Sequence, residues 1–234
     1  VFVGGPRQVG KTTFAQSLLR NFKEGHAGYL NYDNAEDRTR MLAREWPSSQ
    51  KLIVLDEIHK YARWRNLVKG YFDTLKHTHQ FLVTGSARLD YYRKGGDSLL
   101  GRYHYYRLHP LSLSELGFHE DALESLLRFG GFPEPFLAQS DRDTRRWHAQ
   151  RLARVVSEDL RDLERIREVS LVERLAEALP MRVGSPLSVK AIAEDLQIDF
   201  KTADRWITAL ENLYYCYRIP PLVPSSRIRA VKKE

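Results

Sequence analysis

Short apolar runs and segments of helical periodicity alternate along the first part of the chain. The runs, each of four to six residues, are Val1–Gly4, Gly28–Tyr32, Leu52–Leu55, Phe81–Thr84 and Tyr103–Leu108. Between them the apolar spacing predicts helices over Thr12–Phe22, from a cap at Asn34 to Trp46, and over Ala62–Lys76. Strands that alternate with helices in this way are typical of crossover connections. We therefore expect an α/β domain with a parallel sheet, which binds its ligand at the carboxyl ends of the strands.

Helical patterns dominate after Pro110. They predict helices over Leu111–Gly117, over Asp121–Phe129 and along a charged stretch from Gln139 to Arg167. Gly130-Gly131 interrupts this series. Acidic and basic side chains interleave in the long stretch, which favours a solvated helix face with local ion pairs over a binding site.

The pattern of the last segment is that of a helix-turn-helix. Ser188 and Asp199 are placed to cap two helices, over Val189–Leu196 and Phe200–Leu213. The apolar positions that face inward are Ile192, Ala193 and Leu196 on the first helix and Ala203, Trp206, Ile207, Leu210 and Leu213 on the second. Two further segments around the prolines, Tyr214–Ile219 and Ser226–Val231, are expected to pair as the hairpin of a winged-helix-like domain.

These patterns divide the chain into three parts. Residues 1–110 form the core with the sheet, residues 111–185 a helical lid, and residues 186–234 the winged-helix-like domain. The chain opens inside a strand without an initiator Met, so we expect it to be a piece of a longer protein, with the last domain incomplete.

Composition favours a cytoplasmic protein. No segment approaches the roughly 18 apolar residues of a spanning helix. The single cysteine, Cys216, excludes an internal disulfide and fits a reducing compartment. The 37 Lys and Arg against 30 Asp and Glu give a net charge of +7. This excess fits nucleic-acid contact and a merely basic surface equally well.

A phosphate-binding loop follows the first apolar run. The pattern G-x-x-x-x-G-K-[ST] is matched in full by Gly5-Pro6-Arg7-Gln8-Val9-Gly10-Lys11-Thr12. Its glycines let backbone amides turn toward phosphate oxygens, where side chains would block the approach. We expect Lys11 to bridge the β- and γ-phosphates of ATP, Thr12 to ligate Mg²⁺, and Thr13 to reach the α-phosphate.

Two carboxylates end the third apolar run, where a parallel sheet opens to its ligand. We expect Asp56 to hold Mg²⁺ and Glu57 to orient or deprotonate the attacking water. A plain turn is the alternative for such a pair. At the end of the next strand, Ser86, or less favourably Thr84, is a candidate contact to the γ-phosphate or the water. A hydroxyl that caps the following helix is an equal alternative for Ser86.

Basic residues suggest two further contacts. Arg102, just before the last strand, is a candidate arginine finger toward the ATP of a neighbouring subunit, with an ordinary surface arginine as the alternative. In the helix-turn-helix, Lys201, Thr202 and Arg205 lie where a recognition helix meets a major groove. Phosphate contacts are expected from the tail residues Arg227, Arg229, Lys232 and Lys233. Winged helices also serve as protein-docking modules, so a protein partner is the alternative to double-stranded DNA.

The order of these motifs resembles a prokaryotic AAA+-type ATPase family whose C-terminal domain has no known function. The resemblance rests on Gly5–Thr13, Leu52–Glu57, Thr84-Gly85-Ser86, Gly101-Arg102, Pro110-Leu-Ser and Gly130-Gly-Phe-Pro133. It implies an ATPase core with a helical lid and a winged-helix-like unit. It also implies that Pro133 opens the lid beside the adenine. A lid arginine of the sensor type is not evident, which departs from the usual AAA+ pattern.

The sequence therefore predicts an Mg-dependent ATPase that acts as a nucleotide-driven switch or motor on DNA or a protein. A homo-oligomer is consistent with the finger assigned to Arg102. A small-molecule kinase would share the loop but needs an acceptor pocket, and the Asp56-Glu57 pair fits hydrolysis better. A helicase needs a second motor domain, for which this length leaves no room. A DNA-binding regulator with nucleotide-gated binding is a further alternative, although a pure regulator would not need Lys11 or Glu57.

Overall fold

The computed structural model of the chain describes residues 1–85, 103–155 and 168–222. The chain divides into two compact units, Val1–Arg145 and Arg146–Glu234, and the boundary falls inside helix α7 (Asp141–Arg154). The three-part division expected from the sequence stays a prediction. Among the described helices, none combines the length and the hydrophobicity that a bilayer crossing requires.

The first unit is built on a parallel sheet of five strands. In chain order these are β1 (Phe2–Gly4), β2 (Tyr29–Asn31), β3 (Leu52–Asp56), β4 (Gln80–Thr84) and β5 (Tyr105–Arg107). Their order across the sheet is β2-β3-β4-β1-β5, and every neighbouring pair is parallel. Each apolar run of the sequence thus contributes one strand, and the predicted α/β fold with a parallel sheet is confirmed.

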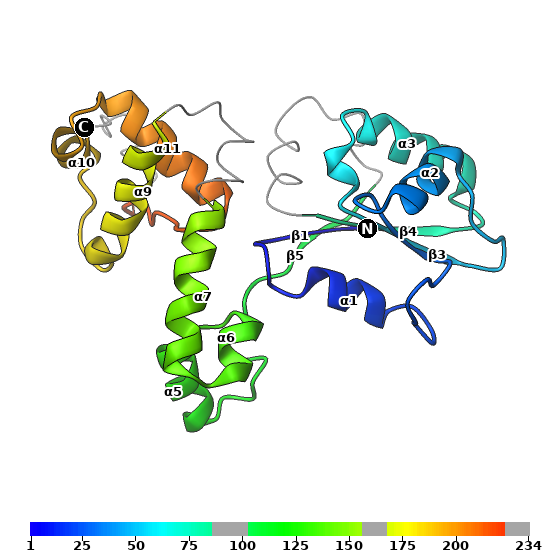
Figure 1. The fold of residues 1–234 in the computed structure, drawn as a ribbon, viewed down its shortest axis with the longest axis horizontal. Helices are drawn as coiled ribbons and strands as arrows, with labels where there is room; N and C mark the ends of the chain where they lie inside the picture. Colours follow the sequence, from blue (N-terminus) through cyan, green and yellow to red (C-terminus); the bar gives the residue numbers. More distant parts are fainter. Residues whose placement is uncertain (86–102, 156–167, 223–234) are drawn as a thin grey trace. The chain divides into compact units, whose positions relative to one another are not determined.

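Helices cover both faces of this sheet (Figure 1). Helix α1 (Lys11–Ser17) lies on one face, and α2 (Ala35–Ala43) and α3 (Trp64–Leu75) lie on the other. Along β3, Ile53 and Leu55 join the buried cluster beneath α2 and α3, whereas Val54 joins the cluster beneath α1. A strand buried on both faces is apolar at every position, which explains why the runs are continuous.

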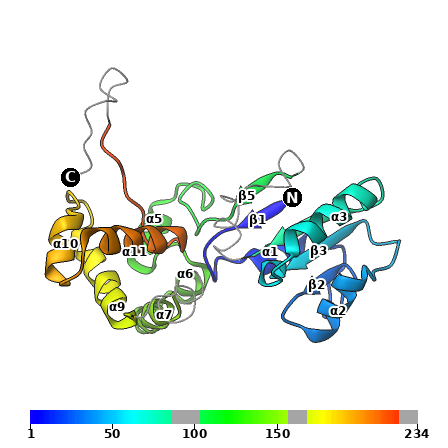
Figure 2. The same ribbon diagram turned by 90° about the horizontal axis from the view of Figure 1, so that it is seen from above.

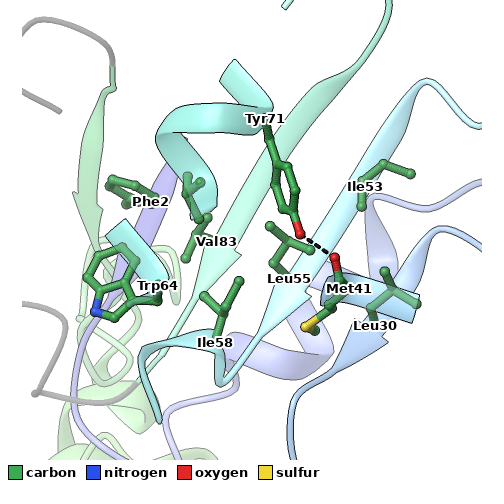
Figure 3. Packing of buried hydrophobic residues seen from close by; sticks show 10 residues of the cluster. Phe2, Leu30, Met41, Ile53, Leu55, Ile58, Trp64, Tyr71 and Val83 are labelled. Carbon is green, nitrogen blue, oxygen red and sulfur yellow. Dashed lines mark hydrogen bonds between the residues drawn. The ribbon is translucent and has the colours of Figure 1, made fainter. Parts of the chain in front are cut away.

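The larger buried cluster ties α2 and α3 to the sheet (Figure 3). The phenol of Tyr71 on α3 donates a hydrogen bond to the backbone carbonyl of Met41 on α2. Trp64, at the start of α3, packs edge-on against Phe2 of β1, with ring centroids 5.9 Å apart. The cluster therefore joins strand β1 to the two helices on this face.

Three predicted helices of the first unit differ from the structure. The helix predicted from Asn34 to Trp46 ends at Ala43, because Arg44 takes a left-handed φ of 61°. Helix α1 ends at Ser17 instead of reaching Phe22, because Leu18 is half exposed and Asn21 takes a left-handed φ of 55°. The helix predicted over Leu111–Gly117 is wrong. The structure has a turn there, closed by Ser112, whose backbone N–H donates to Glu115 Oε2 at 2.9 Å. Gly117 and the residue after it take left-handed φ angles, which stop the turn from growing into a helix.

Two helices of the first unit follow this turn, before α7. They are α5 (Glu120–Phe129) and α6 (Pro133–Ala138), and they pack against each other. Gly130, with a φ of 77°, ends α5 as the sequence predicts. Arg128 of α5 donates from Nε to Oδ1 of Asp141 at 2.8 Å, which joins α5 to the first residue of α7.

The second unit contains the two helices predicted for the helix-turn-helix (Figure 2). Its helices beyond α7 are α9 (Val169–Ala178), the short 3-10 helix η4 (Leu179–Arg182), α10 (Val189–Asp195) and α11 (Phe200–Asn212). Both predicted caps are confirmed: Ser188 accepts from the Ala191 N–H at 3.2 Å, and Asp199 from the Thr202 N–H at 3.0 Å. Helices α10 and α11 pack side by side.

The wing predicted after α11 does not form over its first half. Tyr214–Ile219 contains no strand, and Tyr214 takes a left-handed φ of 57°. Arg218 instead folds back on α11, where its guanidinium donates to Asp204 and Glu211, each at 2.6 Å. Its backbone N–H also donates to Glu211, so this part of the segment is bound to the helix. The second half, Ser226–Val231, lies outside the described residues.

Candidate functional site

The phosphate-binding loop connects strand β1, an interior strand of the sheet, to α1. Gly5 has a φ of 143°, and a Cβ at this position would lie 2.2 Å from the carbonyl oxygen of Leu108. Gly10, the last residue before the helix, has a φ of 91°. Both backbone conformations are open to glycine and costly for other residues. Residues Pro6, Arg7, Gln8 and Val9 make the turn between them, with Val9 buried and Gln8 exposed.

Lys11 is held inside this loop. Its side chain leaves the first position of α1, and the residue is 8% exposed, unusual for a lysine. The ammonium donates to the carbonyl oxygens of Gly5 at 3.2 Å and Pro6 at 2.5 Å. The charge is therefore placed where the loop turns its backbone, which is the position from which it can meet a phosphate. Thr13, two positions later on the same first turn of the helix, is exposed.

Asp56 collects three hydroxyl groups at the end of β3. The residue is 2% exposed, and register places it beside Thr84 of β4 and Asn31 of β2. Thr12 donates to Oδ2 at 2.9 Å, Tyr29 donates to the same oxygen at 2.7 Å, and Thr84 donates to Oδ1. A buried carboxylate is costly unless its oxygens accept hydrogen bonds, and these three donors meet that need.

The donor set suits Mg²⁺. This ion prefers oxygen ligands and is usually bound through one or two protein groups together with substrate phosphates. The Thr12 hydroxyl and the Asp56 carboxylate supply such oxygens 2.9 Å apart, beside the loop. Within the described residues no group of three or more His, Cys, Asp and Glu could hold a metal, so a site for a fully protein-bound ion is not found there.

Glu57 follows Asp56 in a left-handed conformation, with a φ of 57°. Its N–H donates to the carbonyl oxygen of Thr84 at 3.2 Å, which fixes the turn at the end of β3. Burial raises the pKa of the Glu57 carboxyl above its ordinary value; the charge of Lys60 opposes this, and the charge of Asp56 adds to it. A carboxylate that is partly desolvated and so made more basic is suited to accept a proton from water.

A short 3-10 helix, η1 (Ile58–Lys60), supplies the neighbours of Glu57. Lys60 Nζ lies 3.3 Å from Glu57 Oε2 and 2.5 Å from Oδ2 of Asp33, which follows β2. His59 is buried, and its Nε2 lies 3.7 Å from the same Glu57 oxygen. Glu57 is thus oriented by two cationic or potentially cationic groups on one side.

The segment around Pro133 is attached to the loop side of the sheet. Pro133 is the first residue of α6, and the carbonyl of Gly131 accepts from the Leu111 N–H at 2.7 Å. A Cβ on Gly131 would lie 2.4 Å from the Leu111 carbonyl oxygen, so the approach needs glycine. Gln8 of the phosphate-binding loop donates to Glu134 of α6 at 3.5 Å.

The structure thus brings together the predicted residues Lys11, Thr12 and Asp56, with Glu57 adjoining. Ser86 and Arg102 lie outside the described residues, as do Arg227, Arg229, Lys232 and Lys233. Sequence reasoning missed Tyr29 altogether. It also gave Thr84 a phosphate or water contact, where the structure has a partner of Asp56. Polar residues at the carboxyl ends of three neighbouring parallel strands could have predicted that Thr84 contacts Asp56. No local sequence pattern predicts that Tyr29 contacts Asp56.

Comparison with known proteins matches two parts of the chain to family models. Residues 1–117 match the AAA domain, and residues 120–234 match a domain of unknown function, DUF8612. Two curated relatives are the uncharacterized proteins Mb2031c of Mycobacterium bovis and Rv2008c of Mycobacterium tuberculosis. Each is 27% identical over 225 residues, a stretch that covers 94% of this chain and 49% of the relative. The chain therefore spans about half the length of the curated relatives it matches.

Two solved structures show a more distant likeness. One is the Aeropyrum pernix ORC1 protein in complex with DNA, with 16% identity and a TM-score of 0.42, covering 92% of this chain and 77% of that one. The other is a Thermotoga maritima RuvB variant, with 16% identity and a TM-score of 0.39, covering 94% of this chain and 81% of that one. Scores this low do not bear on what the chain binds. The match over residues 1–117 does establish its family: the protein belongs to the AAA-domain family of P-loop NTPases.

Proposed function

We propose that this AAA-domain protein binds ATP with Mg²⁺ and hydrolyses it, as a nucleotide-driven switch or motor that acts on DNA or on a protein. The observation that carries the proposal is the hydrogen bond from Thr12 to Asp56, which joins the phosphate-binding loop to the end of β3. This bond places a threonine hydroxyl and a carboxylate at one point, with the Lys11 ammonium in the adjoining loop.

Each residue has a distinct role in this proposal. The backbone N–H groups of the loop between Gly5 and Gly10, apart from Pro6 which has none, and the Lys11 ammonium bind the phosphates, and Thr13 contacts the α-phosphate. Thr12 and Asp56 hold Mg²⁺, which neutralises charge on the phosphate oxygens when it is bound. Glu57 accepts a proton from the attacking water. The oxygen of that water bonds to the γ-phosphorus, and the bond from the γ-phosphorus to the ADP oxygen breaks. Ser86 is assigned to the γ-phosphate, and Pro133 to the adenine.

Hydrolysis is favoured over transfer to a small molecule by the position of Glu57. A carboxylate of raised pKa next to the metal-binding residue serves as a base for water, and a kinase would need a separate acceptor pocket as well. The alternative of a DNA-binding regulator keeps the helix-turn-helix but gives Glu57 no task. An ATPase and a kinase differ in their products, because only hydrolysis releases phosphate from ATP without an acceptor molecule.

The partner is assigned to the α10–α11 pair. Lys201 and Arg205 are exposed one turn apart on α11, a spacing that suits contacts to nucleic-acid phosphates. The Thr202 hydroxyl donates to Asp199 at 2.5 Å, so it belongs to the helix cap and is a poorer candidate for base contact. A protein partner is the second candidate, since Arg218 holds the segment after α11 against the helix instead of leaving it to form a wing.

The experiment that tests the proposal compares the parent chain with Glu57→Gln. The parent should release phosphate from Mg·ATP without any acceptor. Glu57→Gln should retain ATP and lose about 10²–10⁴-fold in turnover, the usual contribution of a general base. Glu24→Gln, at an exposed position before β2, is the matched control and should behave as the parent does. Equal turnover in parent and Glu57→Gln would remove Glu57 from the reaction.

A further inference from the structure

The hydroxyl of Tyr29 reaches the metal-binding carboxylate from a strand that sequence reasoning did not connect with the site. Tyr29 opens β2, and the sheet register places it beside Val54, two positions before Asp56 on β3. Its ring packs on the α1 face of the sheet, edge-on to Phe22 with centroids 5.7 Å apart. Asp56 alternates with Leu55 and so points to this same face. The tyrosine therefore spans two strand positions to place its oxygen 2.7 Å from Asp56 Oδ2.

The phenol acts as a donor toward Asp56. Burial raises the pKa of Tyr29, and the charge of Asp56 and the hydrogen bond to it raise that pKa further. The phenol thus keeps its proton at any ordinary pH. The side chains of Gln16 on α1 and Asn31 on β2 oppose this rise in the pKa of Tyr29. The phenol hydrogen is directed at the carboxylate, because Tyr29 donates to Asp56 Oδ2.

Tyr29 is one of three hydrogen-bond donors to the Asp56 carboxylate. A carboxylate offers about four acceptor positions, two on each oxygen. Thr12 and Tyr29 occupy Oδ2, and Thr84 donates to Oδ1. The three donors come from α1, β2 and β4, so the plane of the carboxylate is held from three elements. About one acceptor position then remains, on Oδ1, for a further group.

This inference rests on the proposed ATPase function: we propose that Tyr29 is a positioning residue. Together with Thr12 and Thr84 it holds the Asp56 carboxylate in one orientation, and so sets the affinity of the phosphate-binding loop for a divalent cation. Partners of metal-binding carboxylates commonly change metal affinity or activity by about 10- to 100-fold when they are removed. The phenol of Tyr29 donates to Asp56, a metal-binding residue in the proposed site, so nucleotide binding without metal should not depend on it.

The isosteric variant Tyr29→Phe separates this role from packing. It removes one oxygen and keeps the ring against Phe22, so the fold should be retained. Tyr32→Phe is the matched control: Tyr32 lies on the adjoining segment, and its ring packs beside Tyr61 with centroids 6.1 Å apart. Gln16→Leu removes an amide that acts on the phenol of Tyr29 and leaves the tyrosine in place. It supplies a second test should Tyr29→Phe lower the melting temperature.

The measurement is Mn²⁺ binding, followed by electron paramagnetic resonance in the presence of a non-hydrolysable ATP analogue. Tyr29→Phe should raise the half-saturating Mn²⁺ concentration by about tenfold. Gln16→Leu should raise it less, and Tyr32→Phe should match the parent. Binding of the analogue in EDTA, measured by calorimetry, should be equal in all four chains. An unchanged Mn²⁺ requirement in both Tyr29→Phe and Gln16→Leu would overturn the inference. Failure of the parent itself to bind the analogue would instead refute the proposed ATPase.

Discussion

Thr12 and Asp56 lie 44 positions apart in the sequence and are joined by a hydrogen bond of 2.9 Å from the threonine hydroxyl to Oδ2 of the carboxylate. The bond connects the first turn of α1 to the end of β3. It holds because β3 is two strands away from β1 across a parallel sheet, and both strands open at the same edge. Most predictions for the site start from this pair and its neighbours.

Lys11→Ala should weaken binding of Mg·ATP by about thirtyfold, because a charge-assisted hydrogen bond contributes about 2 kcal/mol. The ammonium also bonds the carbonyls of Gly5 and Pro6 in the loop, so the melting temperature without nucleotide should fall modestly. Calorimetric titration gives the affinity. Lys23→Ala, at an exposed position after α1, is the control. Equal affinities of Lys11→Ala and Lys23→Ala would remove the loop from nucleotide binding.

Lys60→Met should lower turnover at pH 6.5 by about fivefold, corresponding to about 1 kcal/mol for a partly exposed ion pair. Burial raises the pKa of Glu57 and Lys60 opposes that rise, so removing the lysine moves the pKa further up. A base works only when it is ionised; activity is therefore lost as pH falls through this pKa, and the loss begins at higher pH in the variant.

The pH profile of turnover distinguishes this role from a structural one. Raising the pH should restore most of the activity of Lys60→Met, and Lys60→Arg should keep the parent profile since it preserves the charge beside Glu57. A Lys60→Met profile with the same acid limb as the parent would show that Lys60 has no influence on the base.

Arg102→Ala should abolish turnover without loss of nucleotide binding if Arg102 serves the ATP of a neighbouring subunit. Chains with Arg102→Ala and chains with Glu57→Gln should then regain activity on mixing, because a shared interface can combine an intact arginine with an intact glutamate. Phosphate release by the mixture and by each variant alone is the measurement. An inactive mixture, or a fully active Arg102→Ala chain, would contradict action between subunits.

Duplex DNA should bind in a salt-dependent manner if α11 and the tail contact its phosphates. Each neutralised phosphate steepens the slope of log K against log salt by about 0.9. Charge reversal at Lys201 and Arg205, or at Arg227 and Arg229, should flatten that slope by about two and weaken all sequences alike. The control is Lys23→Glu in the first unit. A chain that binds no duplex at low salt would favour a protein as the partner of α10 and α11.

Features set by neighbours in the chain were predicted well from the sequence. The caps at Asn34, Ser188 and Asp199 depend on a side chain and the N–H groups two or three positions on, and the structure has all three. The same local reasoning failed for the turn after Pro110. There Ser112 and Glu115 close a turn that resembles a helix start in the sequence, and two consecutive left-handed residues stop the turn from growing into a helix.

The prediction of the first strand of the wing was wrong for a different reason. That strand was inferred from apolar residues between α11 and the prolines, but the segment includes Arg218. Two acidic residues of α11, Asp204 and Glu211, hold that arginine against the helix. Such an ion-pair group depends on how the chain folds back, which the spacing of apolar residues does not indicate.

The sequence by itself determined the phosphate-binding loop, the five strands and the pair Asp56-Glu57, because each is a local pattern with a fixed chemical or geometric requirement. Only the tertiary structure decided which groups surround that pair. Tyr29 and Thr84 meet Asp56, and Asp33 meets Lys60, because the sheet places β2 and β4 on either side of β3. The order of strands in a parallel sheet follows from long crossover connections and the packing of helices on both faces, so the partners of the buried carboxylate could be read only from the folded chain.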